Sequence, residues 1–90
     1  MKWNKAVKEI EEAINNGEDV EIRYHITHDT RHPRFEKVES ISEYEYQGST
    51  CKAINTYHDQ VLEGLHVIDE IYILDSDDYV FTDVYTQRKY

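Results

Sequence analysis

The spacing of apolar residues near the start of the chain predicts one amphipathic helix. Apolar side chains recur at intervals of three and four residues, at Trp3, Val7, Ile10 and Ile14. This spacing places them on one face of a helix, with lysines and glutamates on the other face. Asn4 suits the N-cap and Gly17 suits the C-terminal stop, so we expect the helix over about residues 4–15. Because so short a helix is only marginally stable alone, its apolar face must pack against the segments that follow.

Beyond the helix, apolar and polar residues alternate, which is the pattern of half-buried β-strands. The alternation is regular from Val20 to Ile26 but changes phase after Phe35, and a β-bulge near Ser40–Ser42 would restore it. The segment Gln47–Ser49 predicts a tight hairpin turn. The predicted strands cover about residues 19–27, 35–46, 50–57, 65–68, 71–74 and 79–86, with loops at 28–34 and 58–64.

A helix followed by short antiparallel strands predicts a single α+β domain over residues 1–90. Strands this short, paired with their neighbours in the sequence, close most easily into a strongly bent structure. We therefore expect the N-terminal helix to pack on a strongly bent five- to six-stranded antiparallel sheet or to form part of a small SH3/Sm-like barrel. A chain of 90 residues is long enough for one core and would bury about 60–65% of its unfolded surface.

Three segments of the sequence resemble the Sm-like, SH3-type barrel of WYL-domain and YolD-like proteins. They are the helix end EAINNG, the strand VEIRY and the closing segment GLHVIDEIYIL, and the similar region spans Glu12 to Leu74. The resemblance implies a small barrel and, in such families, a ligand-binding role held by arginines. Here CKAINTY stands near the place of the Trp-Tyr-Leu signature, and Asp69 and Glu70 stand where basic residues are frequent. The resemblance therefore supports the fold and argues against the ligand-binding role of these families.

Negative charge is concentrated in the second part of the chain. Residues 38–90 hold eleven Asp/Glu and three Lys/Arg, whereas residues 1–37 are nearly balanced, and the whole chain has a formal charge of −9. So acidic a segment is normally disordered. This one is also rich in isoleucine, valine and tyrosine, which favour an ordered sheet. The surface of that sheet should repel nucleic acid and anionic membranes and attract basic protein.

The sequence lacks the motifs of common enzymes. A single cysteine excludes an intramolecular disulfide, and three glycines leave no phosphate-binding loop. Cys51 would need an adjacent histidine to act as a nucleophile, so we interpret it as a core residue. His25, His28 and His32 have a spacing that can bind a metal, but one lies in a predicted strand and two in a loop. We interpret them as solvated and expect no metal, no cofactor and no enzymatic activity.

The acidic residues of the predicted strands and the tyrosines among them suggest a function. Carboxylates spaced about 4.8 Å across strands and about 6.6–7 Å along one face approach the charge density of duplex DNA, one charge per about 1.7 Å. We therefore hypothesise a non-enzymatic acidic binding protein that occludes a basic, nucleic-acid-binding surface of a partner protein. Such proteins resemble the DNA-mimic inhibitors that phages use against host defence. The predicted contact residues are Glu39, Glu43, Tyr44, Glu45, Tyr46, Asp75, Asp77, Asp78, Tyr79, Asp83 and Tyr85.

Two further hypotheses fit the same sequence. A WYL-like regulatory or ligand-sensing barrel would bind a nucleotide or peptide through convergent Arg23, Arg31 and Arg34. Alternatively, an unpaired last strand, residues 79–86, would pair with its copy in a homodimer. The N-terminal segment has no uninterrupted apolar run, so we expect neither a signal peptide nor a membrane span, and a cytoplasmic protein.

Overall fold

The computed structural model describes the backbone of residues 2–75 and 78–82 and the side chains of residues 3–73. Within these residues one helix, α1 (Lys2–Asn15), precedes six strands. The strands are β1 (Asp19–Ile26), β2 (Asp29–Tyr46), β3 (Ser49–Thr56), β4 (Gln60–Leu62), β5 (His66–Asp75) and β6 (Asp78–Thr82). They form an antiparallel sheet in the order β4-β3-β2-β1-β5-β6. The predicted α+β fold, with an N-terminal helix on an antiparallel sheet, is confirmed.

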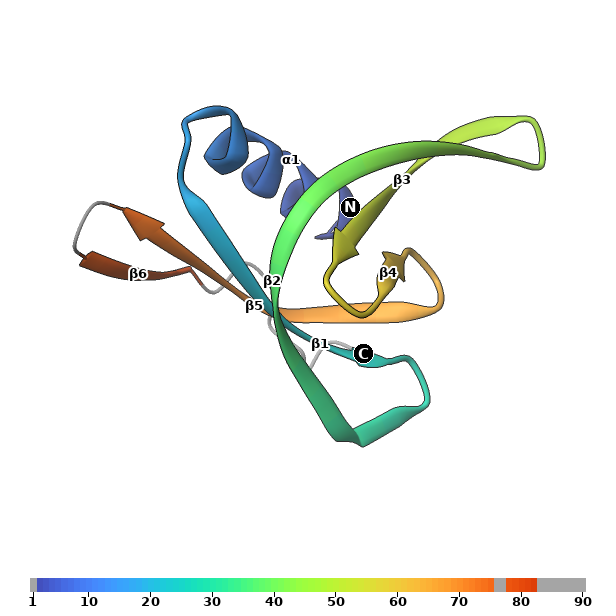
Figure 1. Cartoon of the computed structure of the whole chain (residues 1–90). Helices are drawn as coiled ribbons and strands as arrows, with labels where there is room; N and C mark the ends of the chain where they lie inside the picture. Colours follow the sequence, from blue (N-terminus) through green and yellow to red (C-terminus); the bar gives the residue numbers. More distant parts are fainter. Residues whose placement is uncertain (1, 76–77, 83–90) are drawn as a thin grey trace.

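The long strand β2 bends the sheet (Figure 1). Its first part pairs with β1 up to Lys37, and its second part pairs with β3 from Val38 onward. Glu39 is an extra residue at this changeover, because Val38 and Ser40 face consecutive residues of β3. Such a bulge increases the local twist and lets one strand serve two partners. The bulge therefore lies just before the predicted position, Ser40–Ser42.

The described strands form an open sheet. Strands β4 and β6 lie at its two edges, and the described parts of these strands do not pair with each other to close the sheet into a barrel. Of the two predicted forms, the strongly bent sheet describes the fold, and a closed barrel is not shown.

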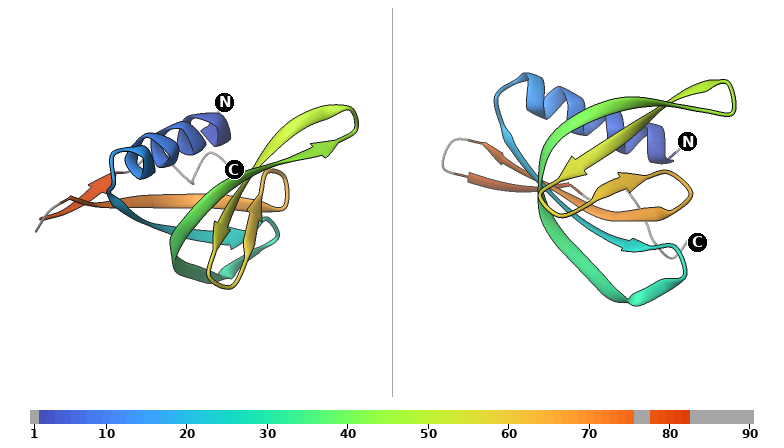
Figure 2. Two further views of the ribbon diagram at one scale, coloured as in Figure 1. Left: turned by 45° about the horizontal axis from the view of Figure 1, so that its top comes forward. Right: turned by 45° about the vertical axis from the view of Figure 1, so that its right-hand side comes forward.

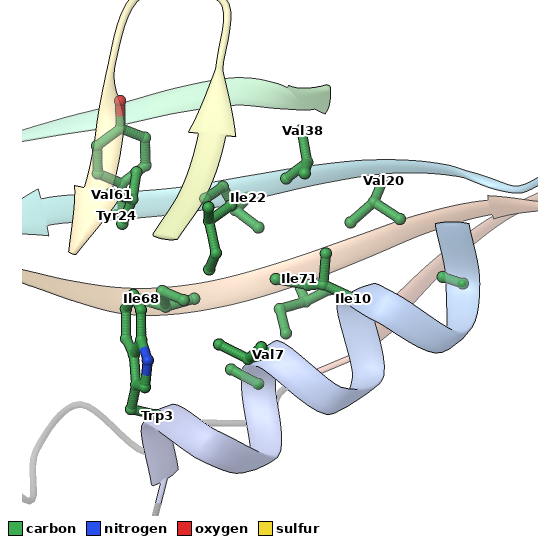
Figure 3. Packing of buried hydrophobic residues seen from close by; sticks show 13 residues of the cluster. Trp3, Val7, Ile10, Val20, Ile22, Tyr24, Val38, Val61, Ile68 and Ile71 are labelled. Atoms are coloured by element: carbon green, nitrogen blue, oxygen red, sulfur yellow. The ribbon is translucent and has the colours of Figure 1, made fainter. Parts of the chain in front are cut away.

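The core lies between α1 and the concave face of the bent sheet (Figure 2). Trp3, Val7 and Ile10 of α1 point toward Ile68 and Ile71 of β5 (Figure 3). A fully buried aliphatic side chain contributes about 1.5–3 kcal/mol relative to an exposed one. The helix is therefore held mainly by packing. The remaining buried residues of the cluster are Ala6, Ala13, Val20, Ile22, Tyr24, Val38, Ile54 and Val61.

The predicted helix start is wrong by two residues. α1 begins at Lys2, so Asn4 lies within the helix and is not its N-cap. The reason is tertiary, because the helix extends far enough to bury Trp3, which is only 8% exposed. The C-terminal stop is confirmed: Gly17 has a φ of 79°, and the N–H groups of Gly17 and Glu18 donate to the carbonyls of Ile14 and Ala13. This is the hydrogen-bond pattern of a Schellman motif.

The predicted loop at residues 28–34 is wrong, because Asp29 already begins β2. A two-residue turn joins Ile26 to Asp29, and residues 30–35, which form the first arm of β2, are exposed. The arm therefore lacks the apolar alternation by which a strand is recognised. Pro33 lies where the register between β1 and β2 is irregular, and such a place tolerates a residue without an N–H.

The second half of the chain also differs from the prediction. The two strands predicted at 65–68 and 71–74 are one strand, β5, with Asp69 as an extra residue opposite β1. This bulge allows both Ile68 and Ile71 to enter the core, although an odd number of positions, three, separates them and a regular strand would direct them to opposite faces. The predicted loop at 58–64 contains β4, whose Val61 is fully buried opposite Ile54. The predicted strand at 79–86 is β6 as far as Thr82, and residues 83–86 lie outside the described residues.

Candidate functional site

Strands β2 and β3 continue past the end of β4 as a two-stranded extension, residues 43–52, which we call the ribbon (Figure 1). Strand β4 pairs with β3 only over residues 53–55, so among the described strands the ribbon has no third partner. Its tip is the predicted tight turn: Gln47 and Gly48 have φ values of 50° and 80°. Two consecutive left-handed residues match the twist of a hairpin. Residues 45–50 are all exposed, so the ribbon presents both faces to solvent.

The ribbon carries carboxylates on one face and tyrosines on the other. In an antiparallel pair, residues directly opposite each other share a face. Glu43 lies opposite Lys52 and Glu45 opposite Thr50, whereas Tyr44 lies opposite Cys51 and Tyr46 opposite Ser49. The predicted surface of interleaved glutamates and tyrosines is therefore divided between two faces, because neighbouring residues of a strand point to opposite sides.

The carboxylate face is anchored to the helix by its only lysine. Lys52 Nζ donates to both carboxylate oxygens of Glu11, at 2.8 and 3.0 Å, and this contact raises the pKa of Lys52. The Thr50 hydroxyl donates to Glu45 Oε2 at 2.7 Å. Glu43 lies directly opposite Lys52, whereas Glu45 lies nearer the tip and keeps the outer part of this face negative.

A hollow of about 560 Å³ opens on the tyrosine face of the ribbon. Its lining is mostly apolar, and two of its side chains are strongly exposed, Tyr46 at 60% and Leu65 at 52%. Burial raises the pKa of Tyr44 in this hollow, and the neighbouring Cys51 and Glu63 raise it further. The hollow is lined by Tyr44, Tyr46, Cys51, Leu62, Glu63, Gly64 and Leu65.

A second hollow, of about 480 Å³, lies between β3 and the start of α1. It shares two lining residues with the first hollow, Cys51 and Glu63. The two hollows therefore meet at the part of the β3 edge that β4 leaves uncovered. The second hollow is lined by Trp3, Asn4, Val7, Lys8, Glu11, Thr50, Cys51, Lys52 and Glu63.

Three of the other predicted contact residues lie in strands away from the ribbon. Strands β5 and β6 form a separate hairpin on the opposite side of α1 (Figure 1). Asp75, Asp78 and Tyr79 are in these two strands. Asp77, Asp83 and Tyr85 lie outside the described residues. Among the predicted set, the residues that the structure brings together are therefore Glu43, Tyr44, Glu45 and Tyr46, with the exposed Glu39 at the base of the ribbon.

The three arginines of the alternative ligand site do not converge. Arg23 and Arg34 lie on opposite faces of the sheet, since Arg34 is opposite Tyr24 of the core face and Arg23 is on the other phase of β1. Each pairs with a carboxylate, Arg23 with Glu70 at 3.2 Å and Arg34 with Asp59. Arg31 is exposed in the first arm of β2.

A polar cluster that the sequence analysis missed surrounds the hydroxyl of Tyr24. This hydroxyl donates to Asp59 Oδ2 at 2.5 Å and lies 3.0 Å from Glu36 Oε2. Burial and the hydrogen bond to Asp59 raise the pKa of Tyr24. The hydrogen bond from Tyr24, and then Arg34, lower the pKa of Asp59. One sequence signal pointed to this cluster: Tyr24 alternates with Val20 and Ile22, which predicts that its ring is buried. A buried tyrosine hydroxyl needs a hydrogen-bond partner.

The cluster fastens the turn between β3 and β4 to the sheet. Thr56 and Asp59 close this turn through three hydrogen bonds of 2.9–3.1 Å. His66 packs edge-on against the Tyr24 ring at 5.6 Å, and its Nδ1 accepts the Leu62 N–H at 3.1 Å. Burial lowers the pKa of His66, so this imidazole is held neutral. These contacts have the form of a structural network.

The histidines considered for metal binding are not brought together. His25 contacts Asp69 Oδ2 at 2.9 Å within the sheet, and His32 contacts Asp29 at 2.8 Å beside the first turn of β2. His28 is exposed. Among the described side chains, those of residues 3–73, no three His, Cys, Asp or Glu are placed to hold one metal ion.

No protein-family model, curated protein or solved structure matches this chain. In the part of the chain that the structure describes, no helix has the length and apolar character required to cross a membrane.

Proposed function

We propose that this protein is a non-enzymatic binding protein that uses its ribbon to occupy a basic, nucleic-acid-binding surface of a partner protein. The observation that carries the proposal is the carboxylate face of an exposed ribbon, on which Glu43 and Glu45 are exposed and Lys52 is bound to Glu11. A two-stranded ribbon is narrow enough to enter a groove that admits an α-helix.

Charge supports the same class of partner. The chain carries a formal charge of −9, and three of its exposed glutamates, Glu39, Glu43 and Glu45, lie on the ribbon and its base. A basic surface that binds nucleic acid would attract these carboxylates, and the encounter would be accelerated at low ionic strength. Direct binding to nucleic acid is disfavoured for the same reason. The protein would therefore act as a competitive, DNA-mimic-type inhibitor.

Capture from a lysate with two matched baits tests this function. One bait is the natural chain and the other is the ribbon variant Glu39→Gln, Glu43→Gln and Glu45→Gln, which keeps side-chain size and removes three charges. We expect basic nucleic-acid-binding proteins on the natural bait at low salt, released by a salt step and displaced by excess duplex DNA. The variant bait should retain much less of them. Equal retention on both baits, or captured proteins that DNA does not displace, would contradict the proposal.

The two other hypotheses receive less support. A ligand-sensing barrel requires convergent arginines, and Arg23 and Arg34 lie on opposite faces with carboxylates already bound. Self-pairing through β6 stays a prediction, since β6 lies at one edge of the sheet order. Light scattering on the purified chain measures its mass in solution and tests the homodimer directly.

A further inference from the structure

The uncovered edge of β3 has the features of a strand-addition site. Strand β4 pairs with β3 over residues 53–55 only, and the next four residues toward the ribbon tip, Ser49–Lys52, pair only with β2 among the described strands. In an edge strand, alternate residues direct their N–H and C=O groups away from the sheet. An extended segment that continues the line of β4 would satisfy those groups.

The two hollows lie where the side chains of such a segment would go. Successive side chains of a strand point to opposite faces. One hollow is on the tyrosine face, the other is on the α1 side, and Cys51 and Glu63 line both of them. Shared lining residues are expected when two hollows lie on the two sides of the path that an added strand would follow. Volumes of about 480 and 560 Å³ fall within the range of ordinary ligand sites.

The chemistry of the hollows specifies the segment. The tyrosine-face hollow is bordered by Tyr44, Tyr46 and Leu65, which suits aliphatic side chains. On the α1 side, Glu11 is already bound by Lys52. Glu63 is exposed and, although Lys8 also lines this hollow, Glu63 forms no ion pair with the described residues. A lysine or arginine of the incoming strand would therefore find Glu63 unneutralised.

We propose that the Ser49–Lys52 edge of β3 receives an extended, basic segment of the partner protein by strand addition, with aliphatic side chains in the tyrosine-face hollow and basic side chains toward Glu63. The inference rests on the proposed function, because it names the segment that the acidic protein recognises. Main-chain hydrogen bonds provide the affinity in such sites, and the pockets for alternate side chains provide the specificity.

The probe is a synthetic peptide in which lysine alternates with leucine or valine over seven residues, with both ends blocked. One control peptide has the same sequence with N-methyl groups on alternate amides, which removes the strand hydrogen bonds and keeps the charge. A second control has the same composition with the lysines in one block. The readout is the rate at which iodoacetamide alkylates Cys51, the only thiol of the chain.

At a peptide concentration ten times its Kd, we expect the alternating peptide to slow alkylation about tenfold, because the free fraction of the site falls accordingly. The amide resonances of Ser49–Lys52 should shift at the same time. The two control peptides should protect Cys51 much less. Equal protection by all three peptides would show attraction by charge alone and would overturn the inference, as would no protection by any of them.

A second experiment separates failure of the inference from failure of the proposed function. The capture assay is repeated with the natural chain alkylated at Cys51 by N-ethylmaleimide, and with the untreated natural chain as the matched control. Loss of the captured proteins from the alkylated bait alone supports the inference. Retention on the alkylated bait overturns strand addition and leaves the proposed function intact. If the three-glutamine ribbon variant retains the captured proteins while the peptide still protects Cys51, the edge site stands and the proposed function fails.

Discussion

The hydroxyl of Tyr24 donates a 2.5 Å hydrogen bond to the carboxylate of Asp59, and this contact joins the centre of β1 to the turn between β3 and β4. The ring of Tyr24 is fully buried, whereas Asp59 lies 35 residues away in the sequence. The contact holds the short strand β4 against the bent part of the sheet. The base of the ribbon is therefore fixed by a polar contact as well as by the core.

Tyr24→Phe should destabilise the protein without changing its packing. The variant keeps the ring and removes the donor to Asp59, and a hydrogen bond to a charged group contributes about 1.5–3 kcal/mol. We expect the free energy of unfolding, measured by urea denaturation, to fall by that amount. Tyr57→Phe is the matched control, because the Tyr57 side chain is 76% exposed. Equal stability of the two variants would contradict a structural role for the Tyr24 hydroxyl.

Stability should decrease as the pH falls through the range in which the unfolded chain protonates His66. Burial lowers the pKa of His66 in the folded protein, so below the ordinary histidine value of about 6.5 the unfolded state binds more protons. His66 therefore makes its full contribution to the free energy of unfolding above that pH. As the pH falls from there to the folded pKa of His66, this contribution is lost at a rate of at most about 1.4 kcal/mol per pH unit.

The measurement is urea denaturation at several pH values for the natural chain and for His66→Asn. The asparagine side-chain oxygen can still accept the Leu62 N–H that Nδ1 accepts in the natural chain, and it does not titrate. We expect a shallower pH dependence below pH 6.5 in the variant. Identical slopes would show that His66 is not the titrating group.

Reversing a charge at the end of α1 should stabilise the helix. α1 has no acidic residue in its first turn and no basic residue in its last turn, which is unfavourable for the helix dipole. Glu12→Lys should therefore raise the free energy of unfolding by about 0.3–1 kcal/mol at low salt. Glu39→Lys makes the same change of net charge on an exposed strand residue and serves as the control. A gain that persists in high salt would indicate a cause other than the dipole.

The ribbon carboxylates should be dispensable for folding. Glu39, Glu43 and Glu45 are exposed, and substitutions at such positions usually change stability by less than about 0.5 kcal/mol. We expect the three-glutamine variant to unfold at the urea concentration of the natural chain within that limit. A loss of more than about 1 kcal/mol would mean that these residues contribute to the fold, and weaker capture by the variant would then have a structural explanation.

The placement of the helix and most strands followed from local patterns in the sequence. The apolar stripe of Trp3, Val7 and Ile10, the stop at Gly17 and the turn at Gln47–Gly48 depend only on spacing and on backbone preferences of single residues. Alternation along a strand also fixes which residues share a face, so the division of glutamates and tyrosines on the ribbon was implicit in the sequence.

The candidate site depended on contacts that no local pattern carries. The bulge at Glu39 lies where β2 changes its partner from β1 to β3. The bulge at Asp69 lets Ile68 and Ile71 enter the same core. The extent of β4, and with it the uncovered edge of β3, is set by tertiary packing of Val61 against the core. Sequence by itself determined the elements and the sign of the surface charge. Only the tertiary structure decided which edge stays open and which carboxylates remain unneutralised, because those properties arise from side chains that are distant along the chain and adjacent in space.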